Sequence, residues 1–200
     1  MGGLKVLAGR KKSLPILWGS LKGMRLPRTA ALGNLHMLIG GYEPGIVAEI
    51  LSMPSPLKVA FDVGAHVGML TLAMAKRVGP EGEVFAFEPF PASRLLVEQM
   101  IAENHLSRTV YAMPFALSDQ NGEQRLVMGQ TPFLHRLGSL SPLDPLKDSE
   151  GIPVRSSTID SFVFDRSNPA PDLLKIDVEG AEVLVLKGAM HTLKTNPPNY

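Results

Sequence analysis

Two acidic residues and two glycines in the first half of the chain have the types and spacing of a site for a nucleotide-like ligand. Asp62 and Glu88 each follow a short apolar run, and Gly64 and Gly68 lie between them. Glycine has no Cβ, so the backbone at these positions can turn sharply and approach a ligand closely. Glu88 lies twenty residues after Gly68. That is about the offset at which an acidic residue meets the ribose hydroxyls of a bound nucleoside.

The spacing of the glycines separates the possible ligands. The turn reads G-x-x-x-G and not G-x-G-x-x-G. A dinucleotide needs free amides at a helix end for its pyrophosphate, whereas Asp62 just before the turn suits an ammonium group. This favours S-adenosylmethionine (SAM) over NAD. A doubly wound domain whose turn glycines serve only packing is the alternative that these residues leave open.

The stretch from Val59 to Pro89 forms one strand–turn–helix–turn–strand unit. Its two strands are short and apolar, and the ten residues after Gly68 are rich in Ala, Leu and Met. Apolar strands joined by a helix imply a parallel sheet that is buried on both faces. Ligands bind beyond the carboxyl ends of the strands in such sheets. We therefore expect Asp62 and Glu88 at two neighbouring strand ends.

The remaining pattern continues the alternation of strands and helices. Strands are predicted at 109–117, 154–164 and 173–178, and helices at 46–51, 92–104 and from Glu179 to Asn196. Asn121-Gly122 is a strong two-residue turn signal and predicts a short hairpin that includes Glu123–Met128. The stretch Gln130–Gly151 is predicted to be a loop that faces the substrate, because so long a connection is usually functional or disordered.

Composition sets the class of protein. Two hundred residues suffice for one domain with a sizeable core. The absence of cysteine excludes disulfides and thiolate metal sites. No apolar run approaches the length of a membrane span, so no transmembrane segment is predicted. A cytoplasmic protein is the expectation; the oligomeric state is not predicted.

The charges are unevenly distributed. Before Glu43 there are seven Lys and Arg residues and no acidic residue, so this part carries +7 and the remainder −6. The basic part is either a patch for acidic lipid or nucleic acid, or a solvated extension. We divide the chain into a basic N-terminal extension with a lid-like helix, residues 1–52, and a SAM-binding domain, residues 53–200.

Several short motifs in a fixed order resemble one family, the FkbM family of SAM-dependent methyltransferases. The strongest is Lys175-Ile176-Asp177-Val178-Glu179-Gly180-Ala181-Glu182, together with Phe61-Asp62-Val63-Gly64-Ala65 and Phe87-Glu88-Pro89. Further matches are Gly41-Tyr42-Glu43, Asn104, Ala116-Leu117-Ser118-Asp119, Thr158-Ile159-Asp160 and Leu186-Lys187-Gly188-Ala189. Any one of these is weak, but the ordered set covers roughly residues 40–195.

The resemblance implies a Rossmann-like class I methyltransferase fold, an α/β fold with a mostly parallel sheet and helices on both faces. It implies transfer of the SAM methyl group to an oxygen, often a hydroxyl of a sugar or another small molecule. Carried over residue by residue, it gives a set of site roles. Asp62, Gly64 and Gly68 would line the methionine part of SAM, Glu88 would hold the ribose hydroxyls, Ser118 and Asp119 would lie near the adenine, and Asp177 would face the methyl group and the acceptor.

An alcohol acceptor must lose its proton, which requires a carboxylate or histidine within hydrogen-bond reach. Asp177 is the first candidate base and Glu179 the second. His66 stands where the family usually has Asn, and it is expected to bind the cofactor without a role in proton transfer. Asp160 and Asp177 alone are too few carboxylates to predict a metal site.

The family continues after the Pro-Pro pair with a fifth strand and a closing antiparallel pair, whereas this sequence stops at Tyr200. The resemblance therefore predicts a sheet without its last strands, with strand 173–178 as an exposed edge. Two alternative functions stay open. One is methylation of RNA, suggested by the basic N-terminus, although a nucleic-acid partner is not favoured. The other is a truncated SAM-domain fragment that acts only by binding.

Overall fold

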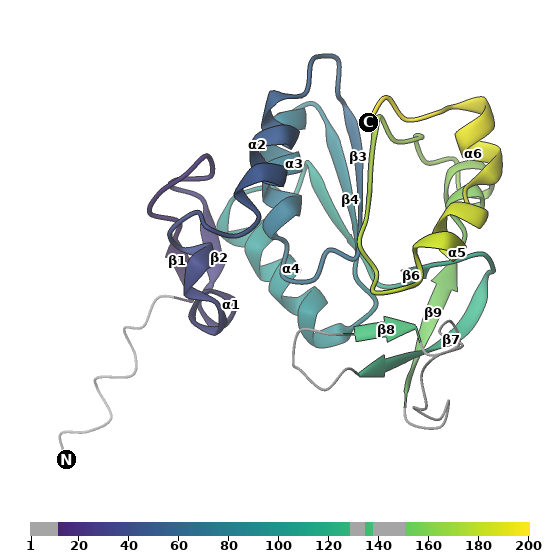
Figure 1. Cartoon of the computed structure of the whole chain (residues 1–200), viewed down its shortest axis with the longest axis horizontal. Coiled ribbons are helices and arrows are strands. Elements are labelled where there is room, and N and C mark those ends of the chain that lie inside the picture. The colour runs from purple at the N-terminus through teal and green to yellow at the C-terminus, as the bar shows by residue number, and fades with distance from the viewer. Residues whose placement is uncertain (1–11, 129–134, 138–150) are drawn as a thin grey trace.

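The computed structural model describes residues 12–128, 135–137 and 151–200. Its centre is a four-stranded parallel sheet (Figure 1). The strands are β3 (Val59–Val63), β4 (Glu83–Phe87), β5 (Val110–Met113) and β10 (Leu173–Ile176). Their order is β10-β3-β4-β5, so β10 pairs with β3 although the two are far apart in the sequence. The predicted α/β fold with a parallel sheet is confirmed.

Helices cover one face of this sheet (Figure 1). These are α2 (Pro44–Ser52), α3 (Met69–Val78) and α4 (Pro91–Glu103). Helix α3 begins directly after Gly68, as predicted, and its first seven residues are all buried. On α4, Val97 and Met100 are fully buried, whereas Leu95 is exposed.

The other face carries a cluster of aromatic rings. Phe162 lies on the π-helix η3 (Ser161–Asp165), and its ring contacts those of Phe61, Phe85 and Phe87 on the sheet. The ring centroids are 5.2–5.5 Å apart in edge-to-face contacts, a geometry that aromatic quadrupoles favour. Helices α5 (Glu182–Lys187) and α6 (Met190–Thr195) complete this side of the molecule (Figure 1).

The single helix predicted from Glu179 to Asn196 is wrong: α5 and α6 are separated at Gly188 and Ala189. A Cβ on Gly188 would lie 2.0 Å from the carbonyl oxygen of Ser118. This close approach fixes how the helix pair faces the sheet, so Val185 and Ala189 point inward. The side chains of Val183, Leu186 and Met190, which would share one face of a continuous helix, are exposed.

A second four-stranded sheet lies beyond the carboxyl ends of the parallel strands (Figure 1). It contains β6 (Ala116–Leu117), β7 (Gly122–Met128), β8 (His135–Leu137) and β9 (Ile152–Ser157), in the order β6-β9-β7-β8. Two predicted strands are corrected here. Strand 109–117 is divided into β5 and β6, which belong to different sheets, and strand 154–164 ends at Ser157 before η3.

The Asn-Gly turn prediction also changes. Asn121 directly precedes β7 and Gly122 is its first residue, but β6 and β7 do not pair, because β9 lies between them. The Asn121 side chain instead accepts hydrogen bonds from Ser157 and Thr158 and donates one to Ser161. Of the predicted loop 130–151, residues 135–137 form β8, and 130–134 and 138–150 lie outside the described residues.

The basic N-terminal segment folds against α3 and α4. Strands β1 (Ser13–Pro15) and β2 (Arg25–Pro27) form an antiparallel pair, followed by the short helices α1 (Arg28–Gly33) and η1 (Leu35–Met37). Asn104 at the end of α4 binds the edge of β2, since its side chain accepts from the amide of Arg25 and donates to the carbonyl of Arg25. The division of the chain at residue 52 remains a prediction.

Candidate functional site

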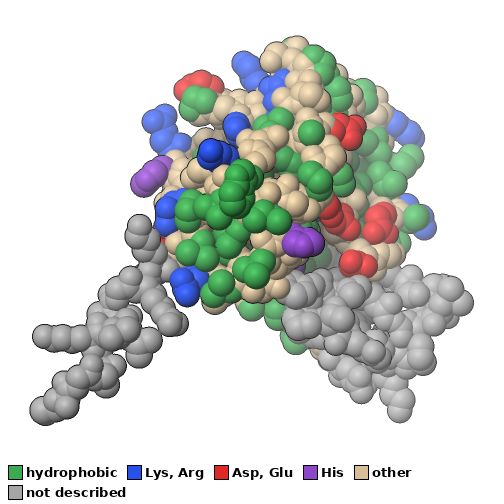
Figure 2. Space-filling view, turned by 60° about the vertical axis from the view of Figure 1, so that its left-hand side comes forward, with side chains coloured by type: hydrophobic (Ala, Val, Ile, Leu, Met, Phe, Trp, Pro, Cys, Tyr) green, Lys and Arg blue, Asp and Glu red, His purple; other side chains and the backbone are tan. Residues whose placement is uncertain are grey.

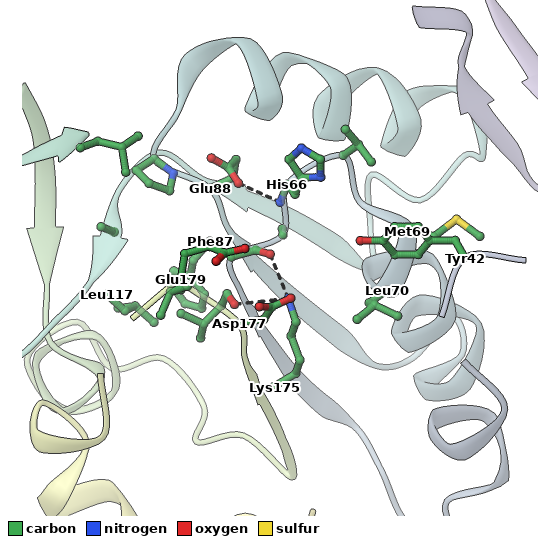
Figure 3. Close-up of a pocket in the computed structure, with 18 of the residues that line it drawn as sticks. Tyr42, His66, Met69, Leu70, Phe87, Glu88, Leu117, Lys175, Asp177 and Glu179 are labelled. Carbon is green, nitrogen blue, oxygen red and sulfur yellow. Dashed lines mark hydrogen bonds between the residues drawn. The ribbon is translucent and has the colours of Figure 1, made fainter. Parts of the chain in front are cut away.

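A cavity of about 330 Å³ opens at the carboxyl ends of β3, β4 and β10 (Figure 3). This volume falls in the range of small-molecule sites, roughly 300–1,000 Å³. Its walls come from parts of the chain that are distant in sequence. They are the segment before α2, the turn after β3 with the start of α3, the end of β4, strands β6 and β7, and β10 with the turn that follows it. The charged or titratable side chains among its lining residues are Tyr42, His66, Glu88, Lys175, Asp177 and Glu179.

Glu88 is nearly buried at the end of β4, with 6% of its surface exposed. One carboxylate oxygen accepts a hydrogen bond from the amide of His66 at 2.8 Å, and the other accepts from the amide of Phe90 at 2.9 Å (Figure 3). Burial raises the pKa of Glu88 from 4.5 to about 7, and the two amides only partly oppose this effect. Glu88 is thus a buried carboxylate that titrates near neutral pH and lines the cavity.

The turn after β3 is closed by the protein's own hydrogen bonds. The amides of Gly64 and Ala65 donate to the carbonyl of Phe87, and the amide of Gly68 donates to that of Ala65. The amide of His66 is held by Glu88, and His66 has a positive φ of 53°. Gly64 and His66 line the cavity, whereas Gly68 does not. Four of the amides that a pyrophosphate would need at this helix end are therefore already used.

Gly64 is required by packing as well as by backbone geometry. Its φ is +81°, and a Cβ there would lie 2.0 Å from the carbonyl oxygen of Asp177. Gly68 has a φ of +85°, and a Cβ there would meet the side chain of Met100 at 2.5 Å. Both glycines therefore bring chain segments together beneath the site. Of these two glycines only Gly64 lines the cavity, and the contact of either with a cofactor stays a prediction.

Asp62 lies below the cavity and is not among its lining residues. It is fully buried; one oxygen accepts from the hydroxyl of Thr71 at 2.6 Å, and the other lies 2.9 Å from the ammonium of Lys175. The contact with Lys175 acts as an ion pair and not as an aligned hydrogen bond. Asp62 thus neutralises a cation of the same chain. This differs from the predicted role of direct contact with a cofactor.

Lys175 is a site residue that our sequence reasoning did not select. Its ammonium lines the cavity and also donates to the carbonyl of Gly64 at 2.9 Å (Figure 3). Lysine in the otherwise apolar strand β10 was the available signal, because such a strand is buried on both faces and a charge in it needs a partner. The partner, Asp62, could be identified only from the pairing of β10 with β3.

Asp177 and Glu179 follow β10, and both are exposed at the cavity (Figure 3). Their turn is held by Glu182, whose carboxylate accepts from the amides of Gly180 and Val178 at 3.1 and 3.4 Å. Burial opposes ionisation of Glu182, but the backbone hydrogen bonds outweigh it, and the pKa of Glu182 is lowered. Two carboxylates that could accept a proton are therefore presented beside Lys175 by a braced turn.

Residues from the N-terminal segment form another wall of the cavity. Asn34, Met37 and Tyr42 all line it, and Tyr42 lies beside Met69 and Leu70 in Figure 3. Burial, assisted by the nearby negative charges of Glu43, Asp177 and Asp62, raises the pKa of Tyr42 to about 12. Tyr42 is consequently a neutral hydrogen-bonding group at physiological pH. Its sequence signal was the Gly41-Tyr42-Glu43 motif.

Ser118 and Asp119 do not line the cavity. Ser118 is fully buried and accepts a hydrogen bond from Gln124, and Asp119 is exposed elsewhere. The residues just before them, Ala116 and Leu117, line the cavity instead. The expected contacts of Ser118 and Asp119 with an adenine therefore stay a prediction that the cavity lining does not support.

Asp160 has a structural role. Its carboxylate accepts from the amides of His191 and Thr192 and from the hydroxyl of Thr192, and so holds the start of α6. Within the described ranges, no group of three or more His, Asp or Glu side chains is placed to hold a metal ion. No helix in the described part of the chain has the length and apolar character needed to cross a membrane.

The fold and the cavity define a class of α/β protein with a ligand site at the carboxyl edge of a parallel sheet. At this edge a buried carboxylate follows one strand, and exposed carboxylates follow another. Comparison with known families makes this specific. The family model of the methyltransferase FkbM domain matches residues 62–200, and the chain belongs to this family.

Two characterised relatives are methyltransferases by name. A methyltransferase called sdnD from Sordaria araneosa is 29% identical over 167 residues, which cover 70% of this chain and 63% of the relative. A hexuronic acid methyltransferase, AglP, from Haloferax volcanii is 24% identical over 155 residues, covering 76% of this chain and 59% of the relative. The matched part thus spans about three fifths of each relative's length.

A solved structure of a related protein was also found. It is the methyltransferase FkbM from Methylobacillus flagellatus, which is 17% identical and covers 74% of this chain and 33% of its own, with a TM-score of 0.49.

Proposed function

We propose that the chain is the SAM-binding part of a methyltransferase that transfers a methyl group to a hydroxyl oxygen of a sugar or another small molecule. The observation that carries the proposal is the cavity in which the buried Glu88 follows β4 while Asp177 and Glu179 follow β10. Membership of the FkbM methyltransferase domain family supports the same reaction.

The charges around the cavity favour a cationic ligand. Glu88, Asp177 and Glu179 line it, and the lining ammonium of Lys175 is neutralised by Asp62 beneath. SAM carries an ammonium and a sulfonium group, which suit such a lining. NAD carries a pyrophosphate, and the amides of the turn after β3 that could bind it already donate to Phe87, Glu88 and Ala65.

When bound, SAM would supply an activated methyl group. Glu88 would accept hydrogen bonds from the ribose hydroxyls, and the apolar side chains of Ala116, Leu117 and Leu126 would cover the base. Asp177, with Glu179 as the second candidate, would accept the proton that the acceptor hydroxyl loses. Much of the rate enhancement in such a displacement comes from positioning, which the Glu182-braced turn provides for both carboxylates.

The acceptor class is inferred from a relative. A hexuronic acid methyltransferase among the similar proteins supports a sugar acceptor. The cytoplasmic location and the absence of a nucleic-acid substrate remain predictions. Methylation of RNA would require binding whose affinity falls steeply with salt.

Calorimetric titration with SAM and with S-adenosylhomocysteine tests the proposal. We expect saturable binding of both, loss of at least tenfold in affinity in Glu88→Ala, and no binding of NAD. Glu98→Ala, an exposed glutamate on α4, is the matched control and should bind as the unmodified chain does. A folded protein that binds neither compound would refute SAM binding, and NAD binding would indicate an oxidoreductase.

Methyl transfer is measured separately, with labelled SAM and uronic acid acceptors. Transfer that is reduced by a hundredfold or more in Asp177→Asn, with unchanged SAM affinity, would support the base role of Asp177. SAM binding without transfer to any hydroxyl acceptor would support the alternative, a domain that acts only by binding.

A further inference from the structure

The N-terminal segment exposes five large apolar side chains. They are Leu17, Trp18, Leu32, Leu35 and Ile39, which we call the N-terminal patch, and between 45% and 59% of each is exposed. Figure 2 brings this side of the molecule forward and shows hydrophobic side chains gathered on it, with Lys and Arg side chains around them. Contiguous exposed apolar surface of this kind commonly marks an interaction site.

The patch is one surface because two distant turns pack together. The amide of Leu17 donates to the carbonyl of Leu38 at 2.7 Å, and a Cβ on Gly40 would lie 2.5 Å from the carbonyl oxygen of Trp18. The turn after β1 therefore lies directly beside the residues that follow η1. Leu32 lies on α1, Leu35 begins η1 and Ile39 follows η1, with the extended residue Asn34 between the two helices.

Cations surround the patch. Lys22 is exposed in the same turn as Trp18, and the ammonium of Lys76 reaches that turn by donating to the carbonyl of Ser20 at 2.6 Å. The amide of Arg28 donates to the carbonyl of Lys12, so these two residues lie side by side. Residues 12–42 contain no Asp or Glu. The apolar surface is thus bordered by positive charge from its own segment and from α3.

We propose that the N-terminal patch binds the surface of a lipid bilayer with anionic headgroups. Leucine and isoleucine side chains can enter the boundary between headgroups and acyl chains, and tryptophan is favoured at that depth. Lysine and arginine near the surface are attracted by the negative potential of anionic lipids.

Two other occupants fit the patch less well. Single-stranded nucleic acid is bound by aromatic side chains that stack on bases, whereas four of the five patch residues are aliphatic. A second copy of the chain in a two-fold contact would bring the same cations face to face without acidic partners.

The position of the patch connects it to the site described above. The same stretch that exposes Leu32, Leu35 and Ile39 contributes Asn34, Met37 and Tyr42 to the cavity wall. Docking through the patch would hold the cavity near the membrane surface, where an amphiphilic acceptor could reach it. The docking inference itself does not depend on methyl transfer.

Trp18 is the only tryptophan in the chain, so its fluorescence reports on the patch alone. The unmodified chain is titrated with vesicles of phosphatidylglycerol and phosphatidylcholine, and separately with phosphatidylcholine alone. We expect a blue shift of Trp18 emission with the anionic vesicles, at least tenfold weaker binding to the neutral ones, and weakening by added salt.

Variants at exposed positions identify the surface. The double variant Leu35→Ser, Ile39→Ser should lose at least tenfold in vesicle affinity, and Lys22→Ala should lose about fivefold, the effect of one surface cation. Leu95→Ser on α4 is the matched control, because Leu95 is as exposed as the patch residues but lies outside the patch. Circular dichroism and thermal midpoints show whether each variant is folded.

Four results would overturn the inference. The first is that Trp18 emission of the folded chain does not shift to the blue with anionic vesicles, and the second is that the double variant binds vesicles as tightly as the unmodified chain. The third is a shift of Trp18 emission with an RNA oligonucleotide but not with vesicles. The fourth is a shift of Trp18 emission with rising protein concentration in the absence of lipid. The third would assign the patch to nucleic acid, and the fourth to a second copy of the chain.

Discussion

At the scale of single residues, Glu88 combines burial with two backbone hydrogen bonds, and burial has the larger effect on its pKa. The pKa of Glu88 is raised from 4.5 to about 7, so the folded state binds a proton more tightly than the unfolded state. Between these two pH values the folded chain holds more protons. Its stability therefore falls as pH rises through this interval.

The first prediction concerns this pH dependence. Between pH 4.5 and pH 8, the Glu88 contribution should lower the free energy of unfolding by roughly 3 kcal/mol. Glu88→Gln cannot ionise and should lack this part of the slope, as measured by urea denaturation at several pH values. Glu98→Gln, at an exposed position, should keep the slope of the unmodified chain. An unchanged slope in Glu88→Gln would contradict the raised pKa.

The same titration should appear in ligand binding. A ribose diol donates hydrogen bonds, and an ionised carboxylate accepts them more strongly than a neutral one. We therefore expect SAM affinity to increase from pH 6 to pH 8 in the unmodified chain and to stay flat in Glu88→Gln, measured by calorimetry. A pH dependence that persists in the variant would assign it to another group.

Lys175 and Asp62 form the second residue-scale feature. Asp62 is fully buried and Lys175 is 15% exposed at its side chain. Removing one partner of such a pair leaves a buried charge without compensation. Lys175→Met should therefore cost about 3–5 kcal/mol of stability.

A double-mutant cycle checks this prediction. Adding Asp62→Asn to Lys175→Met removes the stranded charge and should recover a large part of the loss, measured by urea denaturation. If the two single changes simply add, the ion pair contributes little to the stability of β3 and β10.

At the scale of elements, Gly64 joins the end of β3 to the end of β10. Gly64→Ala must place a Cβ 2.0 Å from the carbonyl of Asp177 at a φ of +81°. Gly79 has a similar φ of +76°, but a Cβ there would have nothing within 4 Å. We expect Gly79→Ala to cost about 1 kcal/mol, and Gly64→Ala to cost more, with weakened SAM binding, by urea denaturation and calorimetry. If the two substitutions lower the stability equally, backbone strain alone would explain why position 64 requires glycine.

The elements also show where local patterns succeed. The strand–turn–helix–turn–strand unit of β3, α3 and β4 could be predicted closely, because all of its signals lie within thirty-one residues. The helix after β10 could not, because the contact between Gly188 and Ser118 that separates α5 from α6 joins distant parts of the chain. The Asn121-Gly122 turn was misread for the same reason, since β9 inserts between β6 and β7.

At the scale of the whole molecule, the N-terminal segment and the parallel sheet share one core. Ile16, Leu21 and Leu26 belong to the same cluster of buried side chains as Leu72 on α3 and Met100 on α4. This continuity bears on whether the chain unfolds as one unit or as two.

The fully buried Leu26 provides the test. Leu26→Ala should lower the stability of the whole chain by about 2–5 kcal/mol in a single transition, seen by circular dichroism and by Trp18 fluorescence together. Leu32→Ala, at an exposed position of the same segment, should have little effect. Separate transitions for the two probes would instead support a boundary near residue 52.

The sequence by itself determined the class of sheet and which strand ends carry the acidic residues, because these follow from hydrophobic period, turn residues and spacing over short distances. Tertiary structure decided what each of those residues contacts. Lys175 reaches the carbonyl of Val63 across 112 positions of sequence, and only the pairing of β10 with β3 shows that Asp62 is neutralised while Glu88 remains at the cavity. Burial and partners depend on contacts between distant segments, and these are absent from any local pattern.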